Sequence, residues 1–169
     1  MKIENISAAA NKLIKQYKSR NPYELADYMG VTVMLRDDFT KLKGMYTIIA
    51  RKRFIFINSN LHPHMQRTVC AHELGHDQLH RELASERCFQ EFVLYDMSLR
   101  PEYEANVFAS ELLLPDDEIL DLIGLEYDNI QIAQTMNSDP NLVGIKASLL
   151  LNRGYNFRIP GYRSDFLKD

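Results

Sequence analysis

The pattern His-Glu-x-x-His at residues 72–76 limits the possible folds of this chain more than any other part of the sequence. It falls inside a helical pattern that begins at Pro63 and runs to about His80. Residues four apart lie on one face of a helix, so the imidazoles of His72 and His76 can point at one metal ion. Zinc favours such nitrogen ligands. The sequence therefore predicts a zinc-binding helix, and the alternative is a solvated helix face without a ligand.

Glu73 follows the first histidine directly and flanks the same face of the helix. Its carboxylate can reach a water held by the metal without itself binding the metal. Zinc lowers the pKa of such a water to about 7, and a neighbouring carboxylate can then take its proton. Glu73 is therefore the predicted catalytic base.

A catalytic zinc needs a third protein ligand and one open coordination position. His80 continues the four-residue series, but it lies about 12 Å along the helix from His72, too far to share one ion. His62 and His64 precede the helix, and no further feature of the sequence supports either as a ligand. We therefore expect His80 to be packed or exposed rather than catalytic.

The next strong helical pattern, Glu102–Leu114, offers carboxylates instead. Glu102 and Asn106 are four residues apart on one face, so Glu102 can bind the zinc while Asn106 accepts a hydrogen bond from a ligating histidine. Glu104 lies about 200° round the helix from Glu102, and only one of the two can face the metal. Glu102 is the predicted third ligand and Glu104 is the alternative. Two histidines and one carboxylate also suit manganese or another divalent ion.

The order of the expected elements is helices, then a small antiparallel sheet, then helices, which is an α+β fold. Asn21-Pro22 predicts a helix start, and Arg51-Lys52-Arg53 predicts the turn of a hairpin. The helix with residues 72–76 should pack on the sheet. The expected elements are helices at Ile6–Tyr17, Tyr23–Met29, Pro63–His80 and Glu102–Leu114, three short helices within 116–152, strands at Val31–Leu35, Gly44–Ala50 and Phe54–Asn58, and an ambiguous short strand at Phe92–Leu94.

With 169 residues, 46% of them hydrophobic, the chain is long enough for one domain with a sizeable core. We expect a single domain with a catalytic core at 1–123, C-terminal helices at 124–152 and a surface tail at 153–169. The two cysteines, Cys70 and Cys88, suit a reducing compartment. No apolar run is long enough to span a membrane, and the first thirty residues lack a signal-peptide pattern. A cytoplasmic location without a membrane partner is therefore expected.

The uneven charge distribution bears on nucleic-acid binding. Residues 1–100 carry 15 basic and 11 acidic side chains, whereas residues 101–145 carry ten acidic side chains and no basic one. Ile130–Leu151 has the spacing of a helix-turn-helix, but its second half offers only Lys146 before Arg153. An acidic surface repels phosphate backbones, so direct DNA binding is not expected. The segment should instead pack on the core or contact a partner protein.

Two segments in combination, His72-Glu73-Leu74-Gly75-His76 and Glu102–Ala109, resemble the ImmA/IrrE metallopeptidases. The resemblance covers roughly residues 20–150 and also includes Asn58–Leu61, Arg67–Val69 and Leu112–Pro115. It implies a zincin-like fold. In that family the ligand glutamate begins a Glu-x-x-x-Asn pattern, which falls on Glu102 and Asn106.

The resemblance also implies a function. It implies a zinc endopeptidase of the short, single-domain ImmA type, which cuts a cytoplasmic helix-turn-helix repressor and relieves repression of mobile-element or stress genes. The substrate would add as a strand to the sheet at Gly44–Ala50 or Phe54–Asn58. Two alternatives stay open: a non-cleaving, zinc-stabilised regulator that sequesters the repressor, and direct DNA regulation through the C-terminal helices.

Overall fold

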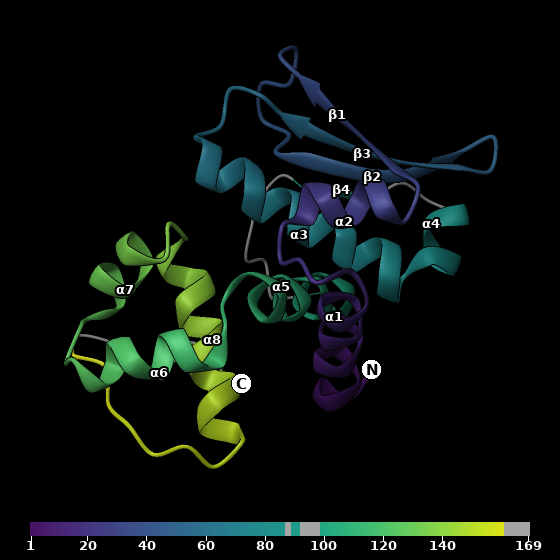
Figure 1. Cartoon of the computed structure of the whole chain (residues 1–169). Coiled ribbons are helices and arrows are strands. Elements are labelled where there is room, and N and C mark those ends of the chain that lie inside the picture. The colour runs from purple at the N-terminus through teal and green to yellow at the C-terminus, as the bar shows by residue number, and fades with distance from the viewer. Residues whose placement is uncertain (87–88, 92–98, 161–169) are drawn as a thin grey trace. The chain divides into compact units, whose positions relative to one another are not determined.

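The computed structural model of the protein describes residues 1–86, 89–91 and 99–160 (Figure 1). Its contacts divide the chain into two compact units, Met1–Leu113 and a second that begins at Leu114. This division falls before the inner boundary expected after residue 123, and the assignment of the whole chain to one domain stays a prediction. The strand expected at 92–94 and the tail from residue 161 lie outside the described residues.

Two helices open the first unit. α1 (Ile3–Tyr17) packs against α5 (Arg100–Leu113) through a buried stripe formed by Ile6, Ala10 and Leu13. α2 (Pro22–Tyr28) begins where the sequence predicts, because the Asn21 side chain accepts a hydrogen bond from the backbone N–H of Tyr23 at 3.0 Å. Pro22 occupies the first helical position, where its missing N–H breaks no helical hydrogen bond.

A sheet of four strands follows, in the order β1–β3–β2–β4. β2 and β3 form the predicted antiparallel hairpin, with Gly44 opposite Ile57. Ala50 and Arg51 at its turn have positive φ angles of 48° and 65°, as a tight two-residue hairpin turn requires. The strands are β1 (Val31–Arg36), β2 (Gly44–Ile49), β3 (Lys52–Asn58) and β4 (Phe89–Glu91). The α+β class is confirmed.

The sheet is mixed, whereas the sequence pattern predicted an antiparallel one. β1 runs parallel to β3, with Val31 opposite Arg53, and β4 pairs antiparallel with β2. The cause is the segment 37–43, which carries the chain past β3 before β2 begins. Asn58 holds this segment, because its side-chain amide donates to the carbonyl oxygens of Phe39 and Leu42 at 3.1 and 3.0 Å. Strand alternation carries no information about such long-range contacts.

α3 (Pro63–Leu79) is the predicted long helix, and together with α2 it lies on one face of the sheet (Figure 1). Every residue from Thr68 to Asp77 is buried, which an amphipathic surface helix would not show. The burial arises because β2 and β3 cover α3 on one side and α5 covers it on the other. α4 (Arg81–Glu86) follows α3 almost directly.

The described part of the second unit contains the three short helices that the sequence predicts. They are α6 (Asp116–Gly124), α7 (Asn129–Thr135) and α8 (Pro140–Asn152). Asp128 and Gln131 form a reciprocal capping box at the start of α7. Lys146 of α8 is buried, and its ammonium pairs with the carboxylate of Asp116. Within the described residues, no helix has the length and apolar character needed to cross a bilayer.

Candidate metal centre

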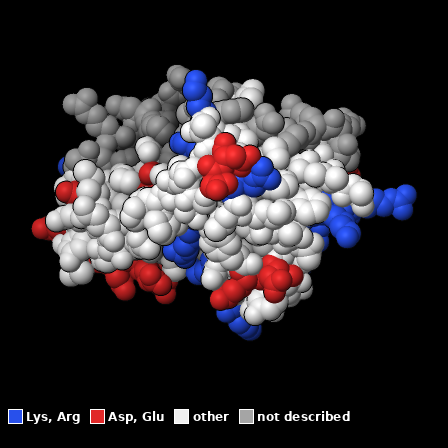
Figure 2. Space-filling view, turned by 90° about the horizontal axis from the view of Figure 1, so that it is seen from above, with Lys and Arg blue, Asp and Glu red and all other residues white. Residues whose placement is uncertain are grey.

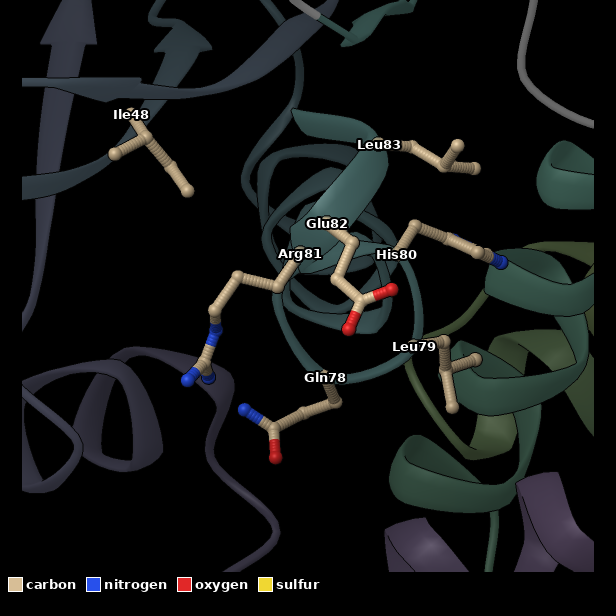
Figure 3. Close-up of a pocket in the computed structure, with 7 residues that line it drawn as sticks. All are labelled: Ile48, Gln78, Leu79, His80, Arg81, Glu82 and Leu83. Carbon is tan, nitrogen blue, oxygen red and sulfur yellow. The ribbon is translucent and has the colours of Figure 1, made fainter. Parts of the chain in front are cut away.

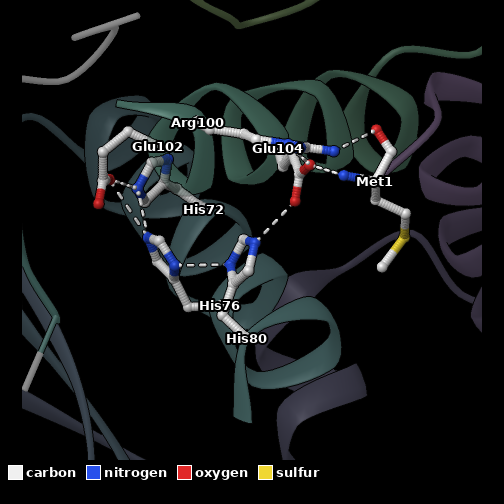
Figure 4. Close-up of polar contacts among 7 residues, drawn as sticks. All are labelled: Met1, His72, His76, His80, Arg100, Glu102 and Glu104. Carbon is white, nitrogen blue, oxygen red and sulfur yellow. Dashed lines mark hydrogen bonds and ion pairs between the residues drawn. The ribbon is translucent and has the colours of Figure 1, made fainter. Parts of the chain in front are cut away.

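Three side chains from α3 and α5 bring their donor atoms to one point (Figure 4). His72 and His76 are buried, and their Nε2 atoms lie 3.1 Å apart. Glu102 directs its Oε2 at the same pair, 3.1 Å from His72 Nε2 and 3.3 Å from His76 Nε2. Two imidazole nitrogens and one carboxylate oxygen fit a divalent transition metal with an open coordination position. The Glu102 side chain is 18% exposed, so the cluster has an approach from solvent.

Gly75 explains how a residue of α5 reaches the histidines of α3. A Cβ at residue 75 would lie 3.1 Å from the Ala105 Cα and 3.2 Å from Cδ1 of Phe108. The absence of a side chain therefore lets the two helices approach closely, and Glu102 lies one turn before this contact. Gly75 is not among the site residues predicted from the sequence, although a glycine inside a helical pattern is a signal for close packing.

Asn106 accepts a hydrogen bond from the other ring nitrogen of His72. Its Oδ1 lies 2.9 Å from His72 Nδ1, and both side chains are buried. When Nδ1 carries the proton, Nε2 presents its lone pair to the cluster, which is the tautomer that a metal needs. The structure thus brings His72, His76, Glu102 and Asn106 together as the sequence predicts, while their functional roles stay predictions.

His76 meets a different partner at its second nitrogen. His76 Nδ1 lies 3.0 Å from His80 Nδ1, and His80 Nε2 lies 3.0 Å from Glu104 Oε2. Glu104 also accepts from Arg100 Nε at 2.9 Å and pairs with the amino group of Met1 (Figure 4). The structure therefore separates the two candidate carboxylates, because Glu102 faces the paired Nε2 atoms and Glu104 faces His80.

Burial sets the protonation of the cluster. It lowers the pKa of His76 to about 4, against the opposing effect of the nearby Glu102 carboxylate. Burial alone would raise the pKa of Glu102, but its close contacts with the imidazoles of His72 and His76 outweigh that effect and hold the pKa well below its usual range. At neutral pH His76 is therefore neutral and Glu102 is ionised, the states that metal binding requires.

Glu73 is fully buried between α3 and the start of β2. A Cβ on Gly44 would lie 2.7 Å from Glu73 Oε1 and 2.4 Å from Cγ1 of Val69. Only glycine lets β2 begin this close to α3, so Gly44 defines the space in which the Glu73 carboxylate lies. The sequence pattern predicts Gly44 only as the first residue of a strand and carries no signal for this contact between strand and helix.

A buried carboxylate, Asp77, fastens the C-terminal half of α3 to the sheet. It accepts a hydrogen bond from the Tyr46 hydroxyl at 2.8 Å and pairs with Arg53 at 3.0 Å and Arg81 at 3.1 Å. Burial, followed by this contact with Asp77, raises the pKa of Tyr46. The network holds α3 in place against the strands that flank Glu73.

A cavity of about 850 Å³ opens at the end of α3, between Ile48 of β2 and residues 78–83. In Figure 3 the imidazole of His80 points away from Ile48, and the side chains of Arg81 and Glu82 extend between them. The cavity adjoins β2 beyond Gly44–Tyr46, the residues that pair with the described part of β4.

The similarity of the chain to known proteins is consistent with a metal-binding site of the peptidase type. Residues 26–147, most of the chain, match the family described as the IrrE N-terminal-like domain, a peptidase family. The chain is 42% identical to "Uncharacterized immunity region protein 2" of Bacillus phage phi105, over 80% of this chain and 84% of that protein. It is 33% identical to "Metallopeptidase ImmA" of Bacillus subtilis (strain 168), over 67% of this chain and 65% of that protein. The chain therefore belongs to the ImmA/IrrE family of metallopeptidases.

A solved structure shares the fold. The "Mycobacterium tuberculosis transcriptional regulator" superposes with a TM-score of 0.60 and 16% sequence identity, over 85% of this chain. This chain spans 47% of that structure's length. At this level of identity the likeness concerns the fold alone.

Proposed function

We propose that the protein is a zinc-dependent endopeptidase that hydrolyses one peptide bond of a helix-turn-helix repressor. The observation that carries the proposal is the convergence of His72 Nε2, His76 Nε2 and Glu102 Oε2 at a partly exposed point. A non-catalytic structural zinc would be expected to have four protein ligands. Three donors with solvent access favour a site that keeps one position open for a reactant.

The roles of the protein's own residues follow from their placement. Bound zinc would polarise the substrate carbonyl and lower the pKa of the attacking water to about 7. His72, His76 and Glu102 hold the ion, and Asn106 keeps His72 in the required tautomer. Glu73 takes the proton from the attacking water and later gives it to the departing amide nitrogen, so the bond breaks without releasing an unstable amide anion.

The sheet offers a place where an extended substrate segment could pair as an added strand. β3 lies between β1 and β2, so the Phe54–Asn58 alternative fails because β3 is not an edge strand. β2 is itself covered by β4 at Gly44–Tyr46, but among the described residues its outer side carries no strand at Thr47–Ile49, where Ile48 lines the adjacent cavity. An extended substrate segment can hydrogen-bond there as an added strand.

A repressor as substrate is supported by the relatives. One carries the name of an immunity region protein and another that of the metallopeptidase ImmA. A cytoplasmic regulator would place the enzyme in the cytoplasm, where Cys70, a free and buried thiol, would stay reduced. DNA itself is not the proposed partner, because Lys146 of α8 is buried against Asp116. On the one face drawn in Figure 2, uncharged and acidic side chains lie among the Lys and Arg side chains.

The test uses a purified helix-turn-helix repressor from the same genome as the candidate substrate. It is incubated with the zinc-loaded protein, with Glu73→Gln and with Glu118→Gln, an exposed control on α6. Intact masses should show one cut by wild type and by Glu118→Gln, and none by Glu73→Gln. A stable complex with no cut in any sample would instead support the sequestering regulator.

A further inference from the structure

A line of polar contacts leads from His76 away from the metal cluster. His76 Nδ1 lies 3.0 Å from His80 Nδ1, His80 Nε2 lies 3.0 Å from Glu104 Oε2, and Arg100 Nε donates to Glu104 at 2.9 Å (Figure 4). His76, His80 and Glu104 are 1%, 6% and 6% exposed. Buried groups at these distances hold a fixed geometry, because breaking one contact leaves a desolvated polar atom.

The direction of each hydrogen bond in this line follows from chemistry. A carboxylate only accepts, so Glu104 accepts from His80 Nε2–H. A neutral imidazole with its proton on Nε2 has a bare Nδ1, so His80 Nδ1 accepts. The donor across the remaining 3.0 Å contact is then His76 Nδ1–H. His76 Nε2 therefore carries a lone pair, and it is this atom that faces Glu102 and His72.

We infer that His80 and Glu104 are positioning residues of the metal centre, with Glu104 orienting His80 and His80 fixing the ring and tautomer of His76. This inference rests on the proposed function in one respect, that His76 binds the metal. The two ligating histidines then have different supports. Asn106 accepts from His72 directly, whereas the carboxylate of Glu104 acts on His76 through a second imidazole.

The helical spacing of α3 places His76 and His80 side by side. His76 and His80 are four residues apart, the same spacing that joins His72 to His76, so the three imidazoles follow one another along one face. His80 is also the C-cap residue of α3, and its backbone N–H donates to the His76 carbonyl at 2.9 Å. Backbone and side chain thus both fix His80 relative to His76.

The first test needs no substitution. In the metal-free protein, imidazole ¹⁵N shifts should show His76 protonated at Nδ1 and His80 protonated at Nε2. His76 protonated at Nε2 would overturn the inference. The measurement is independent of peptidase activity. An inactive protein can still show the expected protonation of His76 and His80, and an active enzyme can still show the opposite one.

The second test measures zinc affinity by competition with a chelator. His80→Phe keeps a ring but removes the acceptor, and it should weaken zinc binding about 10–100-fold, as loss of a supporting partner does. His80→Asn places an amide oxygen near the former Nδ1 position and should restore most of the affinity. His62→Phe, the same change on an exposed residue before α3, is the matched control.

The pattern of these variants separates positioning from simple packing. If packing alone matters, His80→Phe will bind zinc like wild type, or His80→Asn will be as weak as His80→Phe; either result contradicts the inference. Unfolding curves of each variant exclude loss of the fold as the cause. If the wild-type protein binds no zinc, the proposed function fails, and the ¹⁵N measurement still decides the inference.

Discussion

Gly75 of α3 and Ala105 of α5 lie so close that a Cβ on residue 75 would stand 3.1 Å from the Ala105 Cα and 3.3 Å from its carbonyl oxygen. These are backbone atoms, which cannot move aside as a flexible side chain can. The distance between the two helices at this point therefore sets how near Glu102 comes to His72 and His76. A residue without a functional group thus controls the geometry of the candidate ligands.

Gly75→Ala should separate the helices by a few tenths of an ångström. Overpacking of this kind lowers the free energy of unfolding by about 1–3 kcal/mol. The higher helix propensity of alanine offsets about 1 kcal/mol of this loss. The net loss of stability is therefore small, and the larger effect should be on zinc affinity, which we expect to fall about tenfold, as when a metal site loses part of its support. Chelator competition and thermal unfolding measure the two effects separately.

Gly124→Ala is the matched control for Gly75→Ala. Gly124 lies at the end of α6, and a Cβ there would meet no atom within 4 Å. This variant should be neutral or slightly stabilising and should bind zinc like wild type. Equal zinc affinity in both variants would show that the contact between α3 and α5 does not set the ligand geometry.

Gly44→Ala should impair catalysis without impairing metal binding. The Cβ of the alanine would lie 2.7 Å from Glu73 Oε1, which is shorter than a van der Waals contact. The Glu73 carboxylate would therefore have to shift. A displaced general base lowers the rate by at least about a hundredfold, while His72, His76 and Glu102 stay in place. Rates of repressor cleavage and zinc affinities measured on the same preparations would check this. A parallel loss of both would mean that the strand holds the ligands as well as the base.

The parts of this fold that the sequence predicted depend on local spacing. The pairing of His72 with His76, the cap at Asn21 and the hairpin turn all follow from residues within a few positions of one another. The contact between His76 and His80 has the same four-residue spacing, but the sequence predicts only that His80 is packed or exposed and is not a ligand of the ion.

The parts that could not be predicted depend on contacts between distant segments. Asp77 meets Tyr46 and Arg53 across the sheet, and the parallel pairing of β1 with β3 depends on how Asn58 holds the segment 37–43. Alternation and helical periodicity report which face of an element is buried, not which element covers it. The same limit left Glu102 and Glu104 as alternatives until the structure showed which of them faces the Nε2 atoms.

Asp77→Asn should destabilise the protein more than any exposed substitution. Asp77 is fully buried, and its loss of charge leaves Arg53, only 22% exposed, without a carboxylate to balance its charge. Removing one member of a buried ion pair lowers the free energy of unfolding by about 3–5 kcal/mol. We expect a loss at the lower end of this range, because the other partner of Asp77, Arg81, is half-exposed and can be solvated. Urea unfolding of the metal-free protein measures this loss. Asp117→Asn, on the exposed side of α6, should leave the midpoint unchanged.

The stability of the metal-free protein should fall as the pH is lowered from about 6.5 to about 4. Burial depresses the pKa of His76 to about 4 in the folded state from 6.5, so the unfolded chain binds more protons in this interval. The contribution of His76 is complete above pH 6.5 and is lost as the pH falls, by about 3 kcal/mol in total. Denaturant unfolding at several pH values measures the slope. His76→Gln should show a flatter profile, and an equally steep one would assign the slope to other groups.

Glu102→Gln and Glu104→Gln form a pair that tests the assignment of the third ligand. An amide is a poor ligand for zinc, so Glu102→Gln should lose zinc affinity by more than the roughly 10–100-fold expected when a supporting contact is removed. In Glu104→Gln the amide oxygen can still accept from His80 Nε2–H, so its loss should be less than about tenfold. Glu104→Leu, which cannot accept, should fall between the two. Zinc affinities measured by competition rank the three variants. If Glu104→Gln proved the weakest binder, Glu104 would replace Glu102 as the ligand, the alternative that helical spacing alone left open.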